Sequence, residues 1–186
     1  MTRPSPPPPE AVIRAATAAD LGAVAAIFGH YVRGSVVTFE VTPPTVEHWR
    51  HVRDDLLDRG LPFLVCQSGG EVVGYAYAAP WRPKPAYRHT VECTIYLAPG
   101  HTGRGLGRRL LTALQRDCAQ AGAEQMIAVV ADSGDDASAA LHRACGFTEA
   151  GRLRNVGRKH GRRIDTVLFQ CDLTGGGHGG FSNTAT

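Results

Sequence analysis

The sequence has almost no lysine, no strong charge imbalance and no long apolar run. Of its 20 basic residues 18 are Arg, and against 17 acids they leave a formal net charge of only +3. So small a charge does not favour a nucleic-acid-binding protein. No stretch approaches the 18 or so apolar residues of a membrane span, and no apolar segment follows a basic N-terminus as in a secretory signal. We therefore expect neither a membrane nor a nucleic acid as partner.

The pattern of the cysteines does not indicate disulfides or a metal cluster. The chain has five cysteines, an odd number, and no Cys-x-x-Cys pair. Thiols scattered through apolar contexts are typical of small core residues in a reducing compartment. We expect a cytoplasmic protein without a bound metal, whose core includes these thiols: Cys66, Cys93, Cys118, Cys145 and Cys171.

Glycine and proline are ordinary in amount but uneven in position. Five of the 12 prolines fall in the first nine residues, and five of the 22 glycines fall in the last thirteen. Such ends are too poor in apolar residues to repay the entropy of ordering. We predict a Pro-rich tail over 1–10, one domain over 11–173 and a Gly-rich tail over 174–186.

Between these tails, hydrophobic periodicity and turn residues predict alternating strands and helices. The predicted strands cover 11–16, 61–67, 71–80, 90–98, 125–131, 147–156 and 163–173, and the predicted helices cover 17–32, 42–60, 108–122 and 135–145. One strand, a Gly-rich turn, a helix and a further strand form a parallel crossover. We expect an α/β domain with a mixed, mostly antiparallel sheet of about seven strands, flanked by about four helices.

The Gly-rich turn of this crossover has the composition of a phosphate-binding loop. Gly103, Gly105 and Gly107 alternate directly before an amphipathic helix, where backbone N–H groups and the positive end of the helix dipole attract an anion. Arg104, Arg108 and Arg109 can add charge-assisted contacts. The dinucleotide pattern Gly-x-Gly-x-x-Gly fails at Arg108, and no Gly-Lys-Ser/Thr of a P-loop occurs. A tight turn with a basic helix start is the plainer interpretation.

Two motifs resemble those of the GNAT superfamily of N-acetyltransferases. Thr-Gly-Arg-Gly-Leu-Gly over 102–107 resembles its Gln/Arg-x-x-Gly-x-Gly/Ala pyrophosphate loop. Asp-x-x-Ser-x-x-Leu-His-x-x-x-Gly-Phe over 135–147 resembles its Asn-x-x-Ser/Ala-x-x-Leu-Tyr-x-x-x-Gly-Phe segment at the same spacing. The stretches 30–40, 79–97 and 153–173 are most similar to phosphinothricin and methionine sulfoximine acetyltransferases. The resemblance covers about residues 12–173.

This resemblance implies a GNAT-like fold, acetyl-CoA as cosubstrate and a homodimer. The backbone N–H groups of the strand that ends at 97 are the implied pantetheine and oxyanion contacts. Thr102 stands where the family has Gln or Arg, and Asp135 stands where it has Asn. The implied cofactor-binding residues are Ile95, Tyr96, Leu97, Thr102, Gly103, Arg104, Gly105, Leu106, Gly107, Arg108, Asp135 and Ser138.

Two residues are candidates for acid–base chemistry. Glu92 alternates with Val91 and Cys93 and so faces away from them, and partial burial there would raise its pKa toward that of a general base. The resemblance implies the same role, whereas a structural acid paired with an Arg is the alternative. His142 stands at the superfamily's Tyr position, where an imidazole titrating near neutrality could protonate the thiolate or relay a proton from the amine. Taken alone, a helical His is more often a surface or capping residue.

The acceptor side is less well defined by the sequence. Cationic and aromatic residues suit a small amino acid with a second anionic or polar group, and six of 12 positions over 152–163 are basic. Such a run is most often a solvated face, or else an anion-binding surface. Phe28 and Tyr31 fit the buried face of their helix. The candidate substrate-binding residues are Phe39, Tyr77, Arg82, Lys84, Tyr87, Arg154, Lys159 and His160.

The leading hypothesis is an acetyl-CoA-dependent enzyme acting on the α-amine of a small amino acid or analogue, with Glu92 as base. The phosphinothricin, methionine sulfoximine and methionine sulfone class is the one that the resemblance implies. A peptide N-terminus or a polyamine remains open as acceptor, because the cofactor half does not specify it. A non-catalytic CoA-binding or anion-binding module is the remaining alternative.

Overall fold

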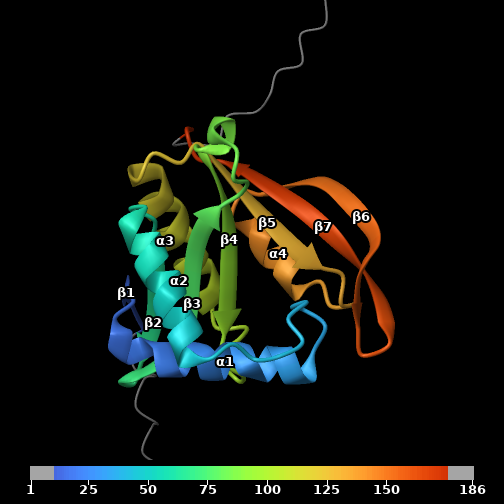
Figure 1. Ribbon diagram of the computed structural model, residues 1–186, viewed down its shortest axis with the longest axis horizontal. Helices are drawn as coiled ribbons and strands as arrows, with labels where there is room; N and C mark the ends of the chain where they lie inside the picture. Colours follow the sequence, from blue (N-terminus) through green and yellow to red (C-terminus); the bar gives the residue numbers. More distant parts are fainter. Residues whose placement is uncertain (1–10, 176–186) are drawn as a thin grey trace, which may run out of the picture.

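The computed structural model describes residues 11–175, which form a seven-stranded sheet with helices on both faces (Figure 1). The strands are β1 (Val12–Ala15), β2 (Phe63–Ser68), β3 (Glu71–Pro80), β4 (Thr90–Leu97), β5 (Gln125–Ala131), β6 (Thr148–Lys159) and β7 (Arg162–Asp172). Their order across the sheet is β1-β2-β3-β4-β5-β7-β6, and only the pair β4–β5 is parallel. The predicted mixed, mostly antiparallel sheet is confirmed. The predicted tails fall outside the described residues except for 174 and 175.

Within residues 11–175 four α-helices cover the sheet, two on each face, as Figure 1 also shows. They are α1 (Leu21–Gly34) and α2 (Val46–Asp58) on one face and α3 (Leu106–Gln120) and α4 (Ala137–Ala144) on the other, with short 3₁₀ turns η1 (Ala18–Asp20) and η2 (Pro85–Tyr87). One hydrophobic core contains the buried sides of α1 and α2, and a second contains those of α3 with Phe147 after α4. Successive residues of β2 enter different cores: Phe63 and Val65 face α1 and α2, whereas Leu64 and Cys66 face α3.

The helix starts follow the capping residues of the sequence. Thr17 and Asp20 form a reciprocal capping box before α1, and Arg14 donates to the Asp20 carboxylate over 2.7 Å. This Arg14 hydrogen bond lowers the pKa of Asp20. The second helix begins at Val46 rather than at the predicted 42, because Thr45 accepts from the His48 N–H as its N-cap. Prolines precede it at positions that a helix interior does not accommodate.

The feature that positions the site is a split in the sheet between its two central strands. The β4–β5 ladder runs from the pair Thr90–Gln125 only as far as Cys93–Ala128. Beyond that point β4 stays paired with β3 up to Leu97, while β5 follows β7 up to Ala131. The two halves of the sheet therefore diverge, and a wedge opens between the carboxyl ends of β4 and β5.

The predicted crossover is confirmed as β4–α3–β5. Within residues 11–175, no helix is long and apolar enough to cross a membrane. The same described part contains no group of three His, Cys, Asp or Glu side chains arranged to hold a metal ion.

Candidate active site

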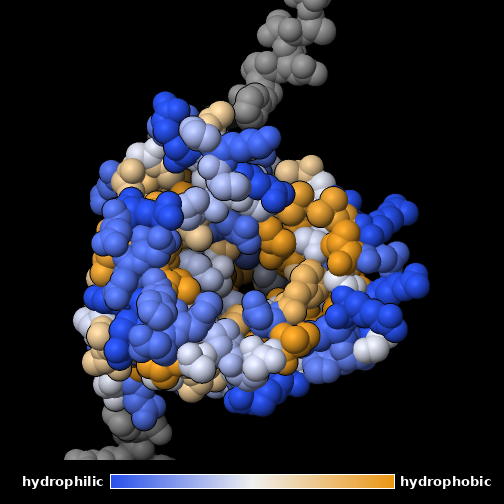
Figure 2. All heavy atoms as spheres, in the orientation of Figure 1, coloured by the Kyte–Doolittle hydropathy of each residue, from blue (hydrophilic) through white to orange (hydrophobic). Residues whose placement is uncertain are grey.

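A cavity of about 720 Å³ occupies the wedge between β4 and β5. The space-filling view shows the hollow near the centre of this face, with hydrophobic side chains gathered on the side of β5, β6 and β7 (Figure 2). Most of the candidate residues line it. These are Phe39, Tyr77, Glu92, Ile95, Tyr96, Leu97, Thr102, Gly103, Gly105, Gly107, Arg108, Asp135, Ser138 and His142.

The Gly-rich loop between β4 and α3 forms one end of this cavity. Gly103 and Gly105 have φ values of +72° and +74°, a conformation that residues with a side chain rarely adopt. Gly105 is the N-cap of α3, so the first N–H groups of the helix lack a carbonyl one turn back and are free to face an anion. Arg108 lies beside them on the cavity lining. A Cβ on Gly107 would lie 3.2 Å from the Leu141 side chain, so glycine there allows α3 and α4 to approach.

Two cofactor candidates depart from the family pattern, Asp135 just before α4 and Thr102 in the loop between β4 and α3. Asp135 lines the cavity, and its carboxylate accepts from the Ala137 N–H over 2.9 Å at the start of α4. Thr102 is exposed at the loop. Leu106 and Arg104 do not line the cavity: Leu106 packs into the α3 core, and Arg104 is exposed.

Glu92 is partly buried in the middle of β4, where it pairs with Ala79 of β3 and Ile127 of β5. Glu92 lines the cavity, Val91 belongs only to the core under α3, and Cys93 belongs to that core and also reaches the cavity beside His142. Burial raises the pKa of Glu92, and the nearby Arg82 guanidinium partly opposes that rise. The predicted alternation of β4 is confirmed. A half-buried carboxylate with a raised pKa suits proton abstraction.

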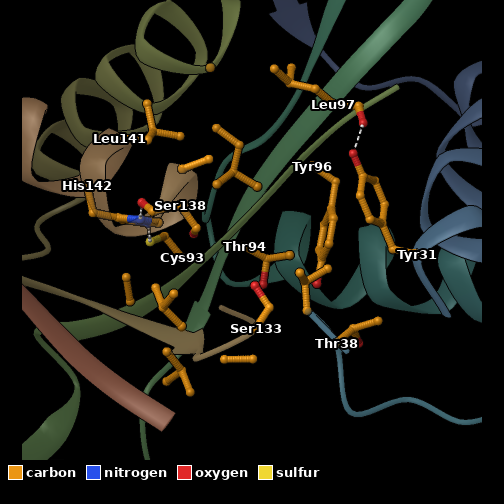
Figure 3. A pocket seen from close by; sticks show the side chains of 18 of the residues that line it. Tyr31, Thr38, Cys93, Thr94, Tyr96, Leu97, Ser133, Ser138, Leu141 and His142 are labelled. Atoms are coloured by element: carbon orange, nitrogen blue, oxygen red, sulfur yellow. Dashed lines mark hydrogen bonds between the residues drawn. The ribbon is translucent and has the colours of Figure 1, made fainter. Parts of the chain in front are cut away.

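His142 lies on the opposite wall of the cavity from Tyr31 (Figure 3) and is 3% exposed. Its Nδ1 lies 2.7 Å from the Ser138 carbonyl oxygen and its Nε2 lies 3.8 Å from the Cys93 Sγ. Because a carbonyl only accepts, Nδ1 carries the proton in the neutral ring, and the Nε2 lone pair faces the thiol. Burial lowers the pKa of His142, with the Ser138 hydrogen bond opposing. The ring packs edge-on against Phe147 and parallel to Phe169.

A polar wall beside β4 was not anticipated from the sequence. The Tyr31 hydroxyl donates to the Leu97 carbonyl over 2.7 Å (Figure 3), and the Tyr96 ring lies beside that of Tyr31, with the ring centroids 5.2 Å apart. Burial raises the pKa of Tyr96 to about 12. Phe28 is buried and Tyr31 half-buried as the periodicity predicts, but both also line the cavity. The helical spacing of apolar residues predicts which face of the helix is buried, but it does not predict that the Tyr31 hydroxyl on that face reaches the cavity.

Six acceptor candidates lie outside the lining of the cavity. The Arg82 guanidinium stacks on Trp81 near Glu92, and Lys84 and Tyr87 are exposed around η2. The other three belong to the β6–β7 hairpin, where Arg154 is exposed, Lys159 is 4% exposed and His160 occupies the turn with φ +49°.

The basic run over 152–163 forms most of that hairpin. Arg152 pairs with Asp132 over 2.6 Å and with Asp165 over 3.1 Å. Apart from Lys159, the other basic side chains of the run are exposed. The interpretation of this run as a solvated face therefore accounts for most of its charge.

The split sheet, the glycine loop and the half-buried acid together define an acyltransferase site, and comparisons with known proteins agree. The family model described as "Acetyltransferase (GNAT) family" matches residues 26–147. The chain belongs to this family and is an N-acetyltransferase. The predictions of family, fold and enzyme class are confirmed.

Named relatives are similar over most of the chain. A phosphinothricin N-acetyltransferase of Alcaligenes faecalis is 48% identical, over 84% of this chain and 80% of its own length. An L-methionine sulfoximine/L-methionine sulfone acetyltransferase of Pseudomonas aeruginosa is 37% identical, over 88% and 95%. Among solved structures, a phosphinothricin acetyltransferase from Sinorhizobium meliloti in complex with AcCoA superposes with a TM-score of 0.84 at 40% identity, over 88% of each chain.

Proposed function

We propose that this enzyme transfers the acetyl group of acetyl-CoA to the α-amine of a small amino acid or analogue. The phosphinothricin, methionine sulfoximine and methionine sulfone class is the acceptor class we assign. The observation that carries the proposal is a half-buried carboxylate, Glu92, lining the cavity where β4 and β5 separate. The names of the relatives at 48% and 37% identity support the acceptor class.

The residues of the cavity fit acetyl-CoA. Gly103 and Gly105 form a loop that leads into the N-terminus of α3, and Arg108 adds positive charge, so this end suits a pyrophosphate. Ile95 and Leu97, on the diverging end of β4, also line the cavity. We assign to this strand the backbone contacts of the pantetheine arm and of the carbonyl oxygen. When bound, acetyl-CoA supplies a thioester whose carbonyl carbon an amine can attack.

Glu92 is the general base of the proposed mechanism. An α-ammonium group must lose a proton before its nitrogen can attack, and Glu92 accepts that proton directly or through water. Burial raises the pKa of Glu92, which makes the carboxylate a stronger base than an exposed one. The N–C bond forms, the C–S bond breaks, and the second proton that the nitrogen loses passes to the departing sulfur.

His142 fits a relay role better than that of a permanent acid. Burial lowers the pKa of His142, so the ring is neutral at pH 7. Its Nδ1 proton is held by Ser138, which leaves the Nε2 lone pair as the group available near Cys93. A neutral imidazole of this tautomer can accept a proton at Nε2 and pass it on.

We retain two further predictions as part of this proposal: a cytoplasmic location and a homodimer. All five cysteines are free thiols, and four of them are buried, which suits a reducing compartment. Size-exclusion chromatography with light scattering measures the oligomeric state directly.

Acceptor competition tests the proposed class. The three acceptors of the class, a peptide with a free N-terminus and a polyamine are each offered with acetyl-CoA, and thiol release is followed. We expect the highest kcat/KM with one of the amino acid analogues. A higher kcat/KM for the peptide or the polyamine would replace the acceptor class while leaving the enzyme class intact.

A further inference from the structure

Lys159, a candidate substrate residue, makes its contact elsewhere. Its ammonium donates to the Thr38 carbonyl over 2.9 Å, and its side chain is almost wholly buried. The two residues are 121 positions apart. Burial lowers the pKa of Lys159, and the charge of Glu40 opposes that effect. A buried ammonium is costly unless a partner compensates its charge. Here the compensating groups are the Thr38 carbonyl and the charge of Glu40, and both belong to the segment 37–40.

A second contact joins the same two segments. Gly157 of β6 is buried, and a Cβ at this position would lie 2.5 to 3.0 Å from carbons of the Phe39 ring. The Phe39 ring therefore packs directly against the backbone of Gly157. Only glycine leaves room for the ring in this place.

These two contacts bridge the halves of the split sheet. The segment 37–40 follows α1, which packs against β3 and β4, whereas the β6–β7 hairpin belongs to the half that contains β5. In Figure 1 the loop between α1 and α2 reaches across toward the β5–β7–β6 side. All four residues of the segment line the cavity, close to Tyr77 and Glu92. The two contacts therefore hold a segment that lies at the Glu92 end of the cavity.

We propose that Lys159 and Gly157 are positioning residues that hold the segment 37–40 in place as the wall of the acceptor site. This inference rests on the proposed function, because it takes the Glu92 end of the cavity as the acceptor end. The glycine loop at the start of α3 contributes to neither contact. Loss of the bridge therefore weakens acceptor binding and leaves acetyl-CoA binding intact.

The first test replaces Lys159 with Met, which keeps the length of the side chain and removes the donor. Arg162→Met is the matched control, because Arg162 is exposed on the same hairpin. We expect the KM for the acceptor to rise about tenfold in K159M, the scale of one lost charge-assisted hydrogen bond. The KM for acetyl-CoA stays within about twofold, as do both KM values of R162M.

The second test uses glycines of the same strand. Gly157→Ala places a methyl group against Phe39, whereas a Cβ at Gly151 meets no atom within 4 Å. G157A raises the KM for the acceptor and G151A does not. If the added methyl group acts through the Phe39 ring, G157A changes the KM for the acceptor much less in a protein that also carries Phe39→Ala than in the wild type. A double-mutant cycle measures this difference. If G157A changes the KM for the acceptor equally in the wild type and in the Phe39→Ala variant, the inference about Gly157 is wrong.

A readout that needs no turnover separates this inference from the proposed function. Hydrogen exchange of the amides of 37–40 speeds up about tenfold or more in K159M and G157A, and not in R162M or G151A. If the wild type is active and K159M keeps both the acceptor KM and the amide protection of the wild type, Lys159 does not hold the segment 37–40 in place. A wild type that acetylates no amine, with faster exchange in K159M, contradicts the proposed function while the bridge itself stands.

Discussion

The Cys93 Sγ lies 3.8 Å from the Nε2 of His142, directly where the β4–β5 ladder ends. Because β4 alternates, the neighbouring Glu92 faces the other way, toward the acceptor end of the cavity. Glu92 and His142 therefore approach the same opening from opposite faces of β4. Burial disfavours the charged form of each group, so it raises the pKa of Glu92 and lowers that of His142.

Buried His142 makes stability sensitive to acid. Its pKa in the folded protein lies below the value of about 6.5 expected after unfolding, so below that pH the unfolded chain binds the extra proton more readily. The free energy of unfolding therefore falls as the pH drops through about 6.5. Chemical denaturation at pH 7.5 and pH 5 measures this loss, which we expect to be smaller in His142→Phe. An equal loss in both proteins would mean that His142 does not titrate as described.

Replacement of Glu92 by Gln removes the proposed base with little change in size. We expect kcat/KM to fall about 100-fold or more. In the wild type the rate rises with pH as Glu92 loses its proton, and burial moves this rise to higher pH than for an exposed Glu. The variant lacks that rise. Glu71→Gln, at an exposed position at the start of β3, is the control and keeps the wild-type profile.

The Gly-rich loop is tested at Gly105. A methyl group on a residue with φ +74° strains the backbone by about 1 kcal/mol and displaces the first N–H groups of α3. Gly105→Ala therefore raises the KM for acetyl-CoA several-fold more than the KM for the acceptor. Gly22→Ala, in α1 with no atom within 4 Å of the added carbon, leaves both KM values unchanged. A larger effect on the acceptor would argue against a cofactor role for this loop.

Glu40 predicts a preference among acceptors. Its carboxylate lines the cavity near Tyr77, so it disfavours a second negative charge on the acceptor. Phosphinothricin carries an anionic phosphinate, whereas methionine sulfone has a neutral side chain. In Glu40→Gln we expect kcat/KM for phosphinothricin to rise about threefold relative to methionine sulfone. An unchanged ratio would remove Glu40 from the acceptor site.

The fold and the cofactor end of the site could be predicted because their signals are local. Strand periodicity, the alternating glycines before α3 and the alternation around Glu92 each lie within a short stretch of sequence. Gly103 and Gly105 adopt the positive φ values that such a loop requires. Element ends shifted by a few residues where a cap such as Thr45 decided the start.

The acceptor end could not be predicted in the same way, because it is assembled from distant segments. The contact of Lys159 with Thr38 spans 121 residues, and no local pattern distinguishes that lysine from the exposed arginines around it. Arg152 likewise meets Asp132 and Asp165 only through the pairing of β5, β7 and β6. Tertiary packing decides which members of a basic run face solvent.

Product analysis tests the central claim most directly. The protein is incubated with acetyl-CoA and, in separate reactions, with methionine sulfone, methionine sulfoximine and phosphinothricin, and each product is identified by mass spectrometry and its acetylated nitrogen by NMR. The account predicts an α-N-acetyl product from at least one acceptor, formed far more slowly by the Glu92→Gln variant. Intact acetyl-CoA and unmodified amino acids after prolonged incubation would contradict it.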